Sequence, residues 1–405
     1  MQGTFKDRLI PLLSGLFVAS LIIIAWGKIQ IELAYHISLS IGGKTKCLIF
    51  GLFALYLITR LLRRDFQGAR SLSDPLTVFT LFCTASLLWA TRPDLVFLTD
   101  NLLPALLGYY MLRYLLEKGR GDGIEYLRVL VLFVVLLILR GPADATGNFL
   151  TDPTVMSTAS EHHTITAMII LAVMPVTFAL LVMDRSRQWW YRSALVVMFL
   201  GMILANSRIG WFTLFPLLLF LLWAFPSRPL QLFCGGLFAF AVLAFLVMFP
   251  HLHGRFMTLF NIGHDNDFLL RIQCWQCTFQ MIRDHLLLGV GFSVNTFMEH
   301  GEKIVPGFMY GHAHNLFLTV LVLTGLVGLA LLLWIMVKIA RGLIFFKRHA
   351  GEAFAPLAAG LGGSFLALFL MNLPDVLLNS CRATLVASLL MAFLFHHCRE
   401  RGGAC

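Results

Sequence analysis

The feature that most constrains this chain is a series of apolar runs separated by short polar turns. Most of the runs approach the roughly 20 residues that an α-helix needs to cross a bilayer, while the two on either side of Arg208 are shorter. The sequence therefore predicts an all-α, polytopic membrane protein with about twelve transmembrane helices. The runs lie at about 9–26, 47–62, 75–91, 95–115, 123–140, 163–183, 193–206, 210–225, 229–249, 314–340, 354–372 and 376–395.

Composition agrees with this class, because only 13% of the 405 residues are charged and 59% are hydrophobic. A soluble protein carries nearly twice that charged fraction. No linker, low-complexity tract or internal repeat divides the chain, so we predict a single transmembrane domain over residues 1–405. Lys6 and Arg8 precede the first run as in a signal peptide, but no small-residue cleavage site follows, and we expect this helix to be retained. The interval 29–43 is interrupted by Glu32 and His36 and is predicted to be a lid or interfacial piece.

Charge placement predicts the orientation. If both termini are cytoplasmic, about two thirds of the 31 Lys and Arg residues fall in cytoplasmic loops, and the others are spread over more loop sequence. This satisfies the positive-inside rule and accounts for the net charge of +10 without a nucleic-acid partner. We therefore expect a multi-pass protein of the cytoplasmic membrane, in which residues 250–312 form one long periplasmic loop.

That loop is predicted to contain helical structure. From Phe268 to Leu288 apolar residues recur at helical spacing, and Gly289-Val-Gly291 then ends the helix. Loops longer than about 15 residues in a compact protein are usually functional or disordered, and this composition is not that of a disordered segment. The apolar positions of the predicted helix are Leu269, Ile272, Trp275, Phe279 and Ile282.

Ionisable residues on the predicted outer side form a candidate site. Arg140 ends one apolar run, Arg208 lies between the two short runs, and Arg271 lies in the predicted loop helix. A guanidinium pairs in bidentate fashion with phosphate oxygens, although a single outer arginine more often contacts lipid headgroups. His312 and His314 precede the run at 314–340. A histidine at a membrane edge either reaches the headgroups or lines a wet functional cavity.

The order of four motifs carries a family resemblance. Asn206-Ser-Arg-Ile-Gly-Trp211 is followed by Arg271-Ile-Gln-Cys-Trp275, by Leu288-Gly-Val-Gly291, and by His314-Asn315 with Gly325 and Gly328 downstream. Each motif alone is weakly specific. Together, over about residues 200–345, they resemble the bacterial O-antigen ligase and polymerase superfamily, membrane glycosyltransferases of the GT-C type. The proline that often precedes Gly-x-Gly in that family is absent, which puts the shape of this turn in doubt.

The resemblance implies an O-antigen ligase of the bacterial inner membrane, acting in lipopolysaccharide biosynthesis. The donor would be a polysaccharide on undecaprenyl diphosphate, and the acceptor a sugar hydroxyl of lipid A-core at the periplasmic face. Transfer would be inverting, without metal or cofactor. His314 would be the general base, because an imidazole with a pKa near 6.5 can take the hydroxyl proton. Arg208, Arg271 and Arg140 would bind the diphosphate, and Asn315, His312 and Asp375 are possible acceptor or orienting residues. Gly325 and Gly328 would permit close helix packing.

Several alternatives remain open at this point. An O-antigen polymerase shares the arginines and the loop, and a lipid or saccharide transporter would also have about twelve spans, although transporters usually show paired halves. Asp265-Asn-Asp267 could hold a divalent metal, but acidic loop residues are usually only solvated. Cys274-Trp-Gln-Cys277 could form a disulfide in an oxidising compartment.

Overall fold

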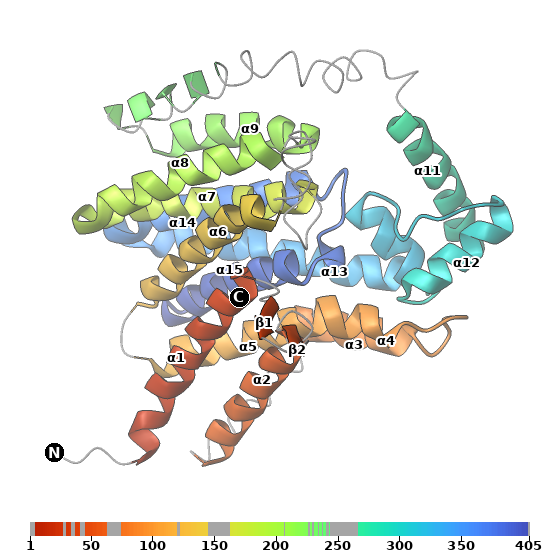
Figure 1. The fold of residues 1–405 in the computed structure, drawn as a ribbon, viewed down its shortest axis with the longest axis horizontal. Helices are drawn as coiled ribbons and strands as arrows, with labels where there is room; N and C mark the ends of the chain where they lie inside the picture. The colour runs from red at the N-terminus through yellow and green to blue at the C-terminus, as the bar shows by residue number, and fades with distance from the viewer. Residues whose placement is uncertain are drawn as a thin grey trace.

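The computed structural model is helical apart from one short hairpin (Figure 1). It describes residues 5–26, 30–33, 37–40, 45–62, 74–119, 122–144, 163–205, 207–225 and 266–403, with scattered residues between 227 and 243. The α-helices are α1 (Phe5–Trp26), α2 (Thr45–Leu62), α3 (Pro75–Ser86), α4 (Leu95–Phe97), α5 (Leu103–Lys118), α6 (Ile124–Asp144), α7 (His163–Met183), α8 (Gln188–Ala205), α9 (Arg208–Ala224), α11 (Asn266–Asp284), α12 (Val294–Ile304), α13 (Leu316–His349), α14 (Gly351–Met371) and α15 (Cys381–Glu400). Short turns of other helix types are η3 (Leu98–Leu102), η4 (Arg185–Arg187) and η6 (Leu377–Asn379).

Helix α7 is the centre of the bundle, and almost all of its side chains are buried. Beyond His163 its sequence is apolar apart from threonines, which is the pattern of a helix surrounded by protein. Helix α14 packs along it, because Gly360 and Gly363 allow the two backbones to approach. A Cβ on Gly360 would lie 2.8 Å from the carbonyl oxygen of Pro175. Such small residues are typical of close crossings between membrane helices.

Helix α15 is the second buried helix, and it packs against α5, α13 and α7. Gly108 of α5 faces this helix, where a Cβ would lie 2.5 Å from Leu385 Cδ1. Helix α3 packs against α13, while α1 packs on α6 and α2 at the edge of the bundle (Figure 1). Helices α11 and α12 lie together at the right-hand end in that view.

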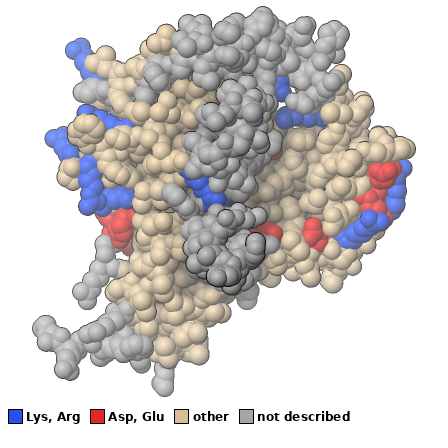
Figure 2. Space-filling view, viewed as in Figure 1, with Lys and Arg blue, Asp and Glu red and all other residues tan. Residues whose placement is uncertain are grey.

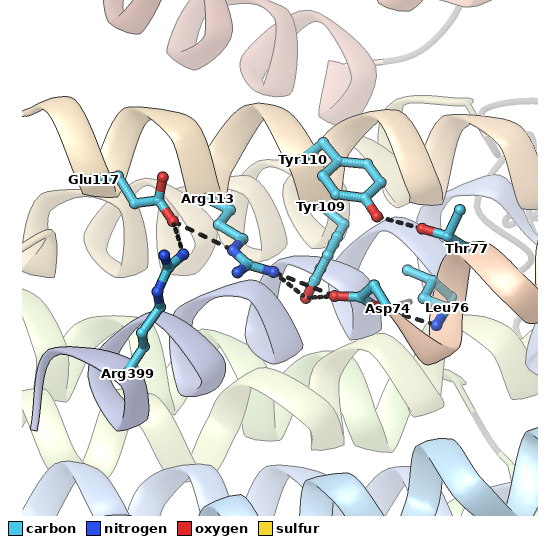
Figure 3. Close-up of polar contacts among 8 residues, drawn as sticks. All are labelled: Asp74, Leu76, Thr77, Tyr109, Tyr110, Arg113, Glu117 and Arg399. Carbon is cyan, nitrogen blue, oxygen red and sulfur yellow. Dashed lines mark hydrogen bonds and ion pairs between the residues drawn. The ribbon is translucent and has the colours of Figure 1, made fainter. Parts of the chain in front are cut away.

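Polar contacts join helix ends at the opposite end of the bundle (Figure 3). Arg113 of α5 donates from Nη1 to Asp74 Oδ2 at 3.2 Å, and Asp74 also caps α3. Glu117 of α5 accepts a hydrogen bond from Arg399 of α15 at 2.9 Å. These bonds bring together arginines that the charge pattern assigns to one side of the membrane.

A second ion pair lies at this same end, where Arg128 at the start of α6 contacts Asp184 after α7 at 2.9 Å. Figure 2 shows Lys and Arg gathered at the left edge of the molecule, over the ends of the long helices. Several of the described arginines that are predicted to be cytoplasmic, among them Arg113, Arg128 and Arg399, therefore lie at one end of the bundle, which agrees with a positive-inside distribution. Which end faces the cytoplasm stays a prediction.

The predicted apolar runs fall on helices wherever the structure describes them, and the run at 229–249 lies mostly outside the described residues. Several described helices are long and apolar enough to cross a membrane, which supports a multi-pass membrane protein. The total of twelve spans and the periplasmic side of residues 250–312 stay predictions. Among the described residues six segments meet the length: Leu95–Lys118, His163–Met183, Arg185–Ala205, Leu316–His349, Gly351–Met371 and Cys381–Glu400, and shorter apolar helices lie at Leu9–Ile24, Gly51–Leu62, Pro75–Ser86 and Arg208–Ala224.

The hairpin is formed by β1 (Gln30–Leu33) and β2 (Ile37–Ser40), which pair antiparallel with Gln30 opposite Ser40. It lies in the interval that the sequence predicts to be something other than a span. Apolar and polar residues alternate through Ile37-Ser-Leu-Ser40, the period of two that is typical of a strand.

Candidate active site at one end of the helix bundle

The loop before α13 holds both candidate histidines in a defined backbone shape. His314 has a φ of +48° and is the only residue other than glycine with a positive φ in the described part of the chain. This left-handed conformation is uncommon for a residue with a side chain. The backbone N–H of His314 donates to Nδ1 of His312 at 3.1 Å. The N–H of Ala313 donates to Thr319 Oγ1 at 3.1 Å, which ties the loop to the first turn of α13.

Asn315 connects this loop to the turn between α14 and α15. As the N-cap of α13, its Oδ1 accepts from the N–H of Leu318 at 2.9 Å, and its Nδ2 donates to the carbonyl of Leu373 at 2.6 Å. The N–H of Leu316 donates to the carbonyl of Asn372 at 3.0 Å. The side chain of Asn315 thus has a structural part in the site, and its predicted contact with acceptor stays a prediction.

The turn itself is shaped by two side chains, those of Asn372 and Asp375. Asn372 is buried, and its Oδ1 accepts from the N–H of Leu377 at 2.8 Å while its Nδ2 donates to the carbonyl of Leu368 at 2.7 Å. Asp375 is only 7% exposed, and its Oδ1 accepts from the N–H of Val376 at 2.8 Å. The turn therefore fixes a buried carboxylate beside the histidine loop.

Helix α11 lies across both the loop and the turn. Nε1 of Trp275 donates to the carbonyl of Ala313 at 2.8 Å, and the thiol of Cys274 lies 3.5 Å from the carbonyl oxygen of His312. One turn earlier, Nη1 of Arg271 lies 3.4 Å from the carbonyl oxygen of Pro374. These side chains share one face of the helix because they are spaced by one turn. Arg271 thereby lies next to the turn that carries Asp375.

His312, His314 and Asp375 form a compact polar cluster. One ionisable side-chain atom from each lies within 4.8 Å of the other two, and the imidazole centroids are 4.3 Å apart. An imidazole can accept a proton from a hydroxyl near neutral pH, and a carboxylate nearby can orient it and compensate the charge that forms. The structure brings together three residues that sequence analysis named as candidates.

A metal ion is the alternative occupant of such a cluster, since histidine and aspartate are common ligands. The geometry of His312 argues against it. Its Nδ1 already accepts the N–H of His314, so the neutral ring carries its proton on Nε2. Binding a cation at either nitrogen would cost that hydrogen bond or displace that proton. The prediction of metal-independent chemistry stays a prediction, and the alternative at Asp265 and Asp267 lies outside the described side chains.

Arg208 is the first residue of α9, near the same end of the bundle. Two residues later, Gly210 packs on α7, where a Cβ would lie 3.0 Å from the Cβ of Ala167. The next residue of α7, Met168, lies 3.8 Å from Nδ2 of Asn372. This series of contacts places the start of α9 next to the helices that carry the cluster. That the Arg208 guanidinium faces His314 across one cavity stays a prediction.

Arg140 lies near the end of α6 and is 9% exposed. Two residues before it, Ile138 packs against α8, where a Cβ on Gly201 would lie 2.9 Å from Ile138 Cδ1. The third predicted arginine therefore lies at the same end of the bundle, on the α6–α8 side. Its contact with a diphosphate stays a prediction.

Helix α13 is broken at Gly325, whose φ is +66°. The carbonyl of Val322 before the break accepts from the N–H of Val290 at 2.9 Å, and the N–H of Leu326 after it donates to the carbonyl of Leu286 at 2.9 Å. Non-helical backbone is tolerated inside a membrane only where other protein groups satisfy it. The segment 286–291 performs that role here.

The two glycine motifs predicted separately from the sequence meet at this break. A Cβ on Gly325 would lie 2.2 Å from the carbonyl oxygen of Leu287, and a Cβ on Gly289 would lie 2.4 Å from the backbone N of Thr324. The close helix packing predicted for Gly325 is therefore wrong, because the tight contact is made with the loop after α11 rather than with another helix. The break lies about three helical turns after Asn315, the N-cap of α13.

An apolar cavity of about 390 Å³ lies beside the cluster, between α3, α5, α13, α14 and α15. It reaches Leu316 and Asn372 next to the histidine loop, and Leu343 and Met391 farther along the helices. Its polar lining side chains are Asn372, Thr384 and Ser388, so the remainder of the wall is hydrocarbon. Such a cavity suits an apolar chain rather than a sugar.

The loop helices differ in detail from the prediction. Helix α11 ends at Asp284 rather than at Leu288, and α12, with Ser293 as its N-cap, was not predicted. Ile282 of the predicted apolar face is buried, but Leu269 and Phe279 are exposed. The buried face instead carries Cys274, Cys277 and Thr278, because α11 packs on loops through its small side chains.

The two cysteines of α11 are free thiols in this structure. Burial raises the pKa of Cys274 to about 12 and that of Cys277 to about 11. The disulfide that the sequence left open is thus not formed here. Neutral, buried thiols of this kind are poor nucleophiles and poor metal ligands.

One family model matches the part of the chain that carries most of the candidate residues. No curated protein matches the chain. A family model described as O-antigen ligase matches residues 193–333, which contain Arg208, Arg271, both histidines of the cluster and both glycine motifs. The matched segment runs from α8 to the second half of α13, while Asp375 lies beyond it. Over these residues, the chain is similar to the O-antigen ligase family.

Proposed function

We propose that this protein is an O-antigen ligase, a lipid-carrier-dependent glycosyltransferase of lipopolysaccharide biosynthesis. It transfers a polysaccharide from undecaprenyl diphosphate to a sugar hydroxyl of lipid A-core at the periplasmic face, with inversion and without metal. One observation carries this proposal: the loop that holds His314 meets the turn that holds Asp375 where α11 lies across both. This site lies beside the apolar cavity, and most of it falls in the segment that matches the family model.

His314 acts as the general base that accepts the proton of the acceptor hydroxyl. Asp375 compensates the imidazolium that forms, as a carboxylate does beside a catalytic histidine. The 4.8 Å limit on their separation supports this pairing. A positioned base contributes on the order of 10²–10⁴-fold to rate.

Arg271 and Arg208 bind the diphosphate of the donor, with Arg140 in a lesser role. Diphosphate is a good leaving group, so the protein needs chiefly to stabilise the negative charge that develops on it. Arg271 is best supported because its Nη1 lies 3.4 Å from the Pro374 carbonyl, one residue before Asp375. A guanidinium can engage two phosphate oxygens at once.

The apolar cavity between α13, α14 and α15 receives the isoprenoid chain of the donor. One end of the cavity lies at Leu316 and Asn372, next to the cluster, so a bound chain would present its diphosphate at the histidine loop. Apolar walls favour such a chain over water. The isoprenoid chain of the donor is thereby held in the apolar cavity, and its diphosphate lies at the polar end of the bundle.

The test is a deletion of the gene in the bacterium that carries it, complemented by wild type or by His314→Ala. A ligase mutant keeps lipid-linked polymer and loses the ladder of polymer on lipopolysaccharide, and only wild type restores the ladder. A strain that keeps single repeat units on lipopolysaccharide and lacks long polymer would instead indicate a polymerase. Failure to present lipid-linked repeats at the outer face would indicate a transporter.

A further inference from the structure

The bond between His312 and His314 has the form of an Asx turn. In that turn the side-chain oxygen of Asn or Asp accepts the backbone N–H two residues later, and here an imidazole nitrogen takes the place of the oxygen. Nδ1 of His312 accepts the N–H of His314 at 3.1 Å. The residue whose amide is held, His314, is the one with the left-handed φ of +48°.

The other backbone groups of the loop are held by different elements. Helix α11 donates to the carbonyl of Ala313 through Trp275 and lies against the carbonyl of His312 through Cys274. The N–H of Ala313 is held by Thr319 of α13. The amide of His314, in contrast, is held by the side chain of His312.

We propose that His312 is a positioning residue: its unprotonated Nδ1 holds the backbone of His314 in the left-handed conformation and thereby aims the His314 imidazole at the acceptor hydroxyl. This rests on the proposed role of His314 as general base. His312 itself need not touch substrate. The neutral ring that makes this bond keeps its proton on Nε2, on the side away from the bonded amide.

The same bond makes the loop sensitive to protonation of His312. A protonated ring would place an N–H at Nδ1, facing the N–H of His314, and the hydrogen bond would be lost. Among the described residues, the ionisable side chains that contact His312 or the segments beside it are Tyr310 and His314 on its own loop, Asp375 on the adjoining turn, and Cys274 and Arg271 on α11.

Two substitutions distinguish the effect of the hydrogen-bond acceptor of His312 from the effect of its ring shape. His312→Asn supplies a carbonyl oxygen that accepts the same amide, whereas His312→Phe keeps a ring of similar shape and has no acceptor. Each variant is purified and assayed with lipid-linked polymer and lipid A-core extracted from a strain that lacks the gene. We expect His312→Phe to lose about 10²-fold in kcat, the cost of misplacing a reacting group by about 1 Å, with the KM for the lipid-linked donor little changed. We expect His312→Asn to recover most of that loss.

Either of two results would overturn the proposal. One is a His312→Phe variant as fast as wild type, which would show that the acceptor is dispensable. The other is a His312→Asn variant as slow as His312→Phe, which would show that the imidazole itself is required. Unfolding temperatures of both variants in detergent are measured alongside. If His312→Asn does not fold, it is replaced by His312→Asp, which offers the same acceptor geometry, and if His312→Phe does not fold, it is replaced by His312→Leu, which also has no acceptor.

The pH profile gives a readout that a merely structural residue would not change. In wild type, two histidines must be unprotonated for turnover, so log kcat/KM should rise with a slope approaching two at acid pH. In His312→Asn the slope should fall to one, because only the base then titrates. An unchanged slope would contradict the proposal.

A measurement without turnover separates this proposal from the proposed function. Nitrogen-15 spectra of histidine-labelled protein report which ring nitrogen carries the proton, and the signal missing in His312→Asn belongs to His312. A neutral ring protonated on Nε2 supports the positioning bond even if no transfer activity is found. A ring protonated on Nδ1 excludes the bond whatever the protein catalyses.

Discussion

The backbone of Gly325 lies directly against the carbonyl of Leu287, so that a Cβ on the glycine would be 2.2 Å from that oxygen. Leu287 belongs to the segment that follows α11, and Gly325 is the break in α13. The loop helix is therefore fastened in two places: the segment after its C-terminus contacts α13 at Gly325, and Trp275 in its middle donates to Ala313 in the loop before α13. The site is part of the bundle rather than a lid that lies over it.

Gly325→Ala should destabilise the protein strongly. Gly325 has a φ of +66° and a ψ of −167°, a conformation essentially confined to glycine that costs a residue with a side chain roughly 1–3 kcal/mol. The clash with the Leu287 carbonyl adds to this cost because that atom is backbone and cannot rotate away. Gly15→Ala is the control, since nothing lies within 4 Å of its added Cβ and alanine favours helix. Thermal unfolding in detergent should show a lowered midpoint for Gly325→Ala alone. Equal midpoints for the two variants would mean that the break is not rigid.

The sequence was a good guide to the helices, and it named three residues, His312, His314 and Asp375, that the structure brings together. Apolar length predicts a membrane helix because the bilayer demands it, and ordered motifs indicated His314, Arg208 and Arg271 before any coordinates. The same apolar run gave no warning that α13 is broken at Gly325. Glycine in a membrane helix also serves close helix packing, and only the neighbouring segment 286–291 decides between the two uses.

The turn residues were less predictable for a physical reason. Asn372 and Asp375 lie some 60 residues from the histidine loop, and their bonds to it depend on how α14 returns along α7. The hydrogen bond from His314 to His312 likewise follows from one backbone angle, which no residue pattern specifies except at glycine. The spacing of apolar residues along the sequence predicts helices and strands, whereas the site lies in the loops and turns where the helices end.

His314→Ala should abolish most of the transfer activity and leave the fold intact. The side chain is partly exposed, so its removal opens no core cavity, and a positioned base is worth about 10²–10⁴-fold. Ligation by the purified variant, measured next to its unfolding temperature, provides the check. A variant with near wild-type turnover would remove His314 from the mechanism.

Arg271→Ala should weaken donor binding as well as turnover, and Arg271→Lys should recover little. A lysine carries the charge but cannot form the two parallel bonds that a guanidinium makes to phosphate oxygens. Arg208 should behave in the same way, and Arg140→Ala should have the smallest effect of the three. The measurement is the apparent KM and kcat for lipid-linked donor across the variants. Full recovery of KM and kcat in Arg271→Lys would show that Arg271 contributes only its positive charge.

Transfer should persist in excess EDTA. The arginines supply positive charge at the diphosphate, and His312 offers no free nitrogen to a cation without losing its bond to the His314 amide. Purified protein is assayed with chelator and then with added magnesium or manganese. Activity that is lost in the chelator and restored by either ion would instead indicate a metal site at Asp265 and Asp267.

Lys303→Cys should react with a membrane-impermeant maleimide added to intact spheroplasts. Lys303 lies at the end of α12 and pairs with Glu299 at 2.8 Å, and its side chain is well exposed. The native Cys274 and Cys277 give little background, because burial raises the pKa values of both thiols to about 12 and about 11 and shields them from reagent. A cysteine at Arg187, in the turn between α7 and α8, is the matched control and should react only after the membrane is opened. The opposite pattern of labelling would invert the orientation and place the histidine cluster on the cytoplasmic side, where lipid-linked polymer is not presented to a ligase.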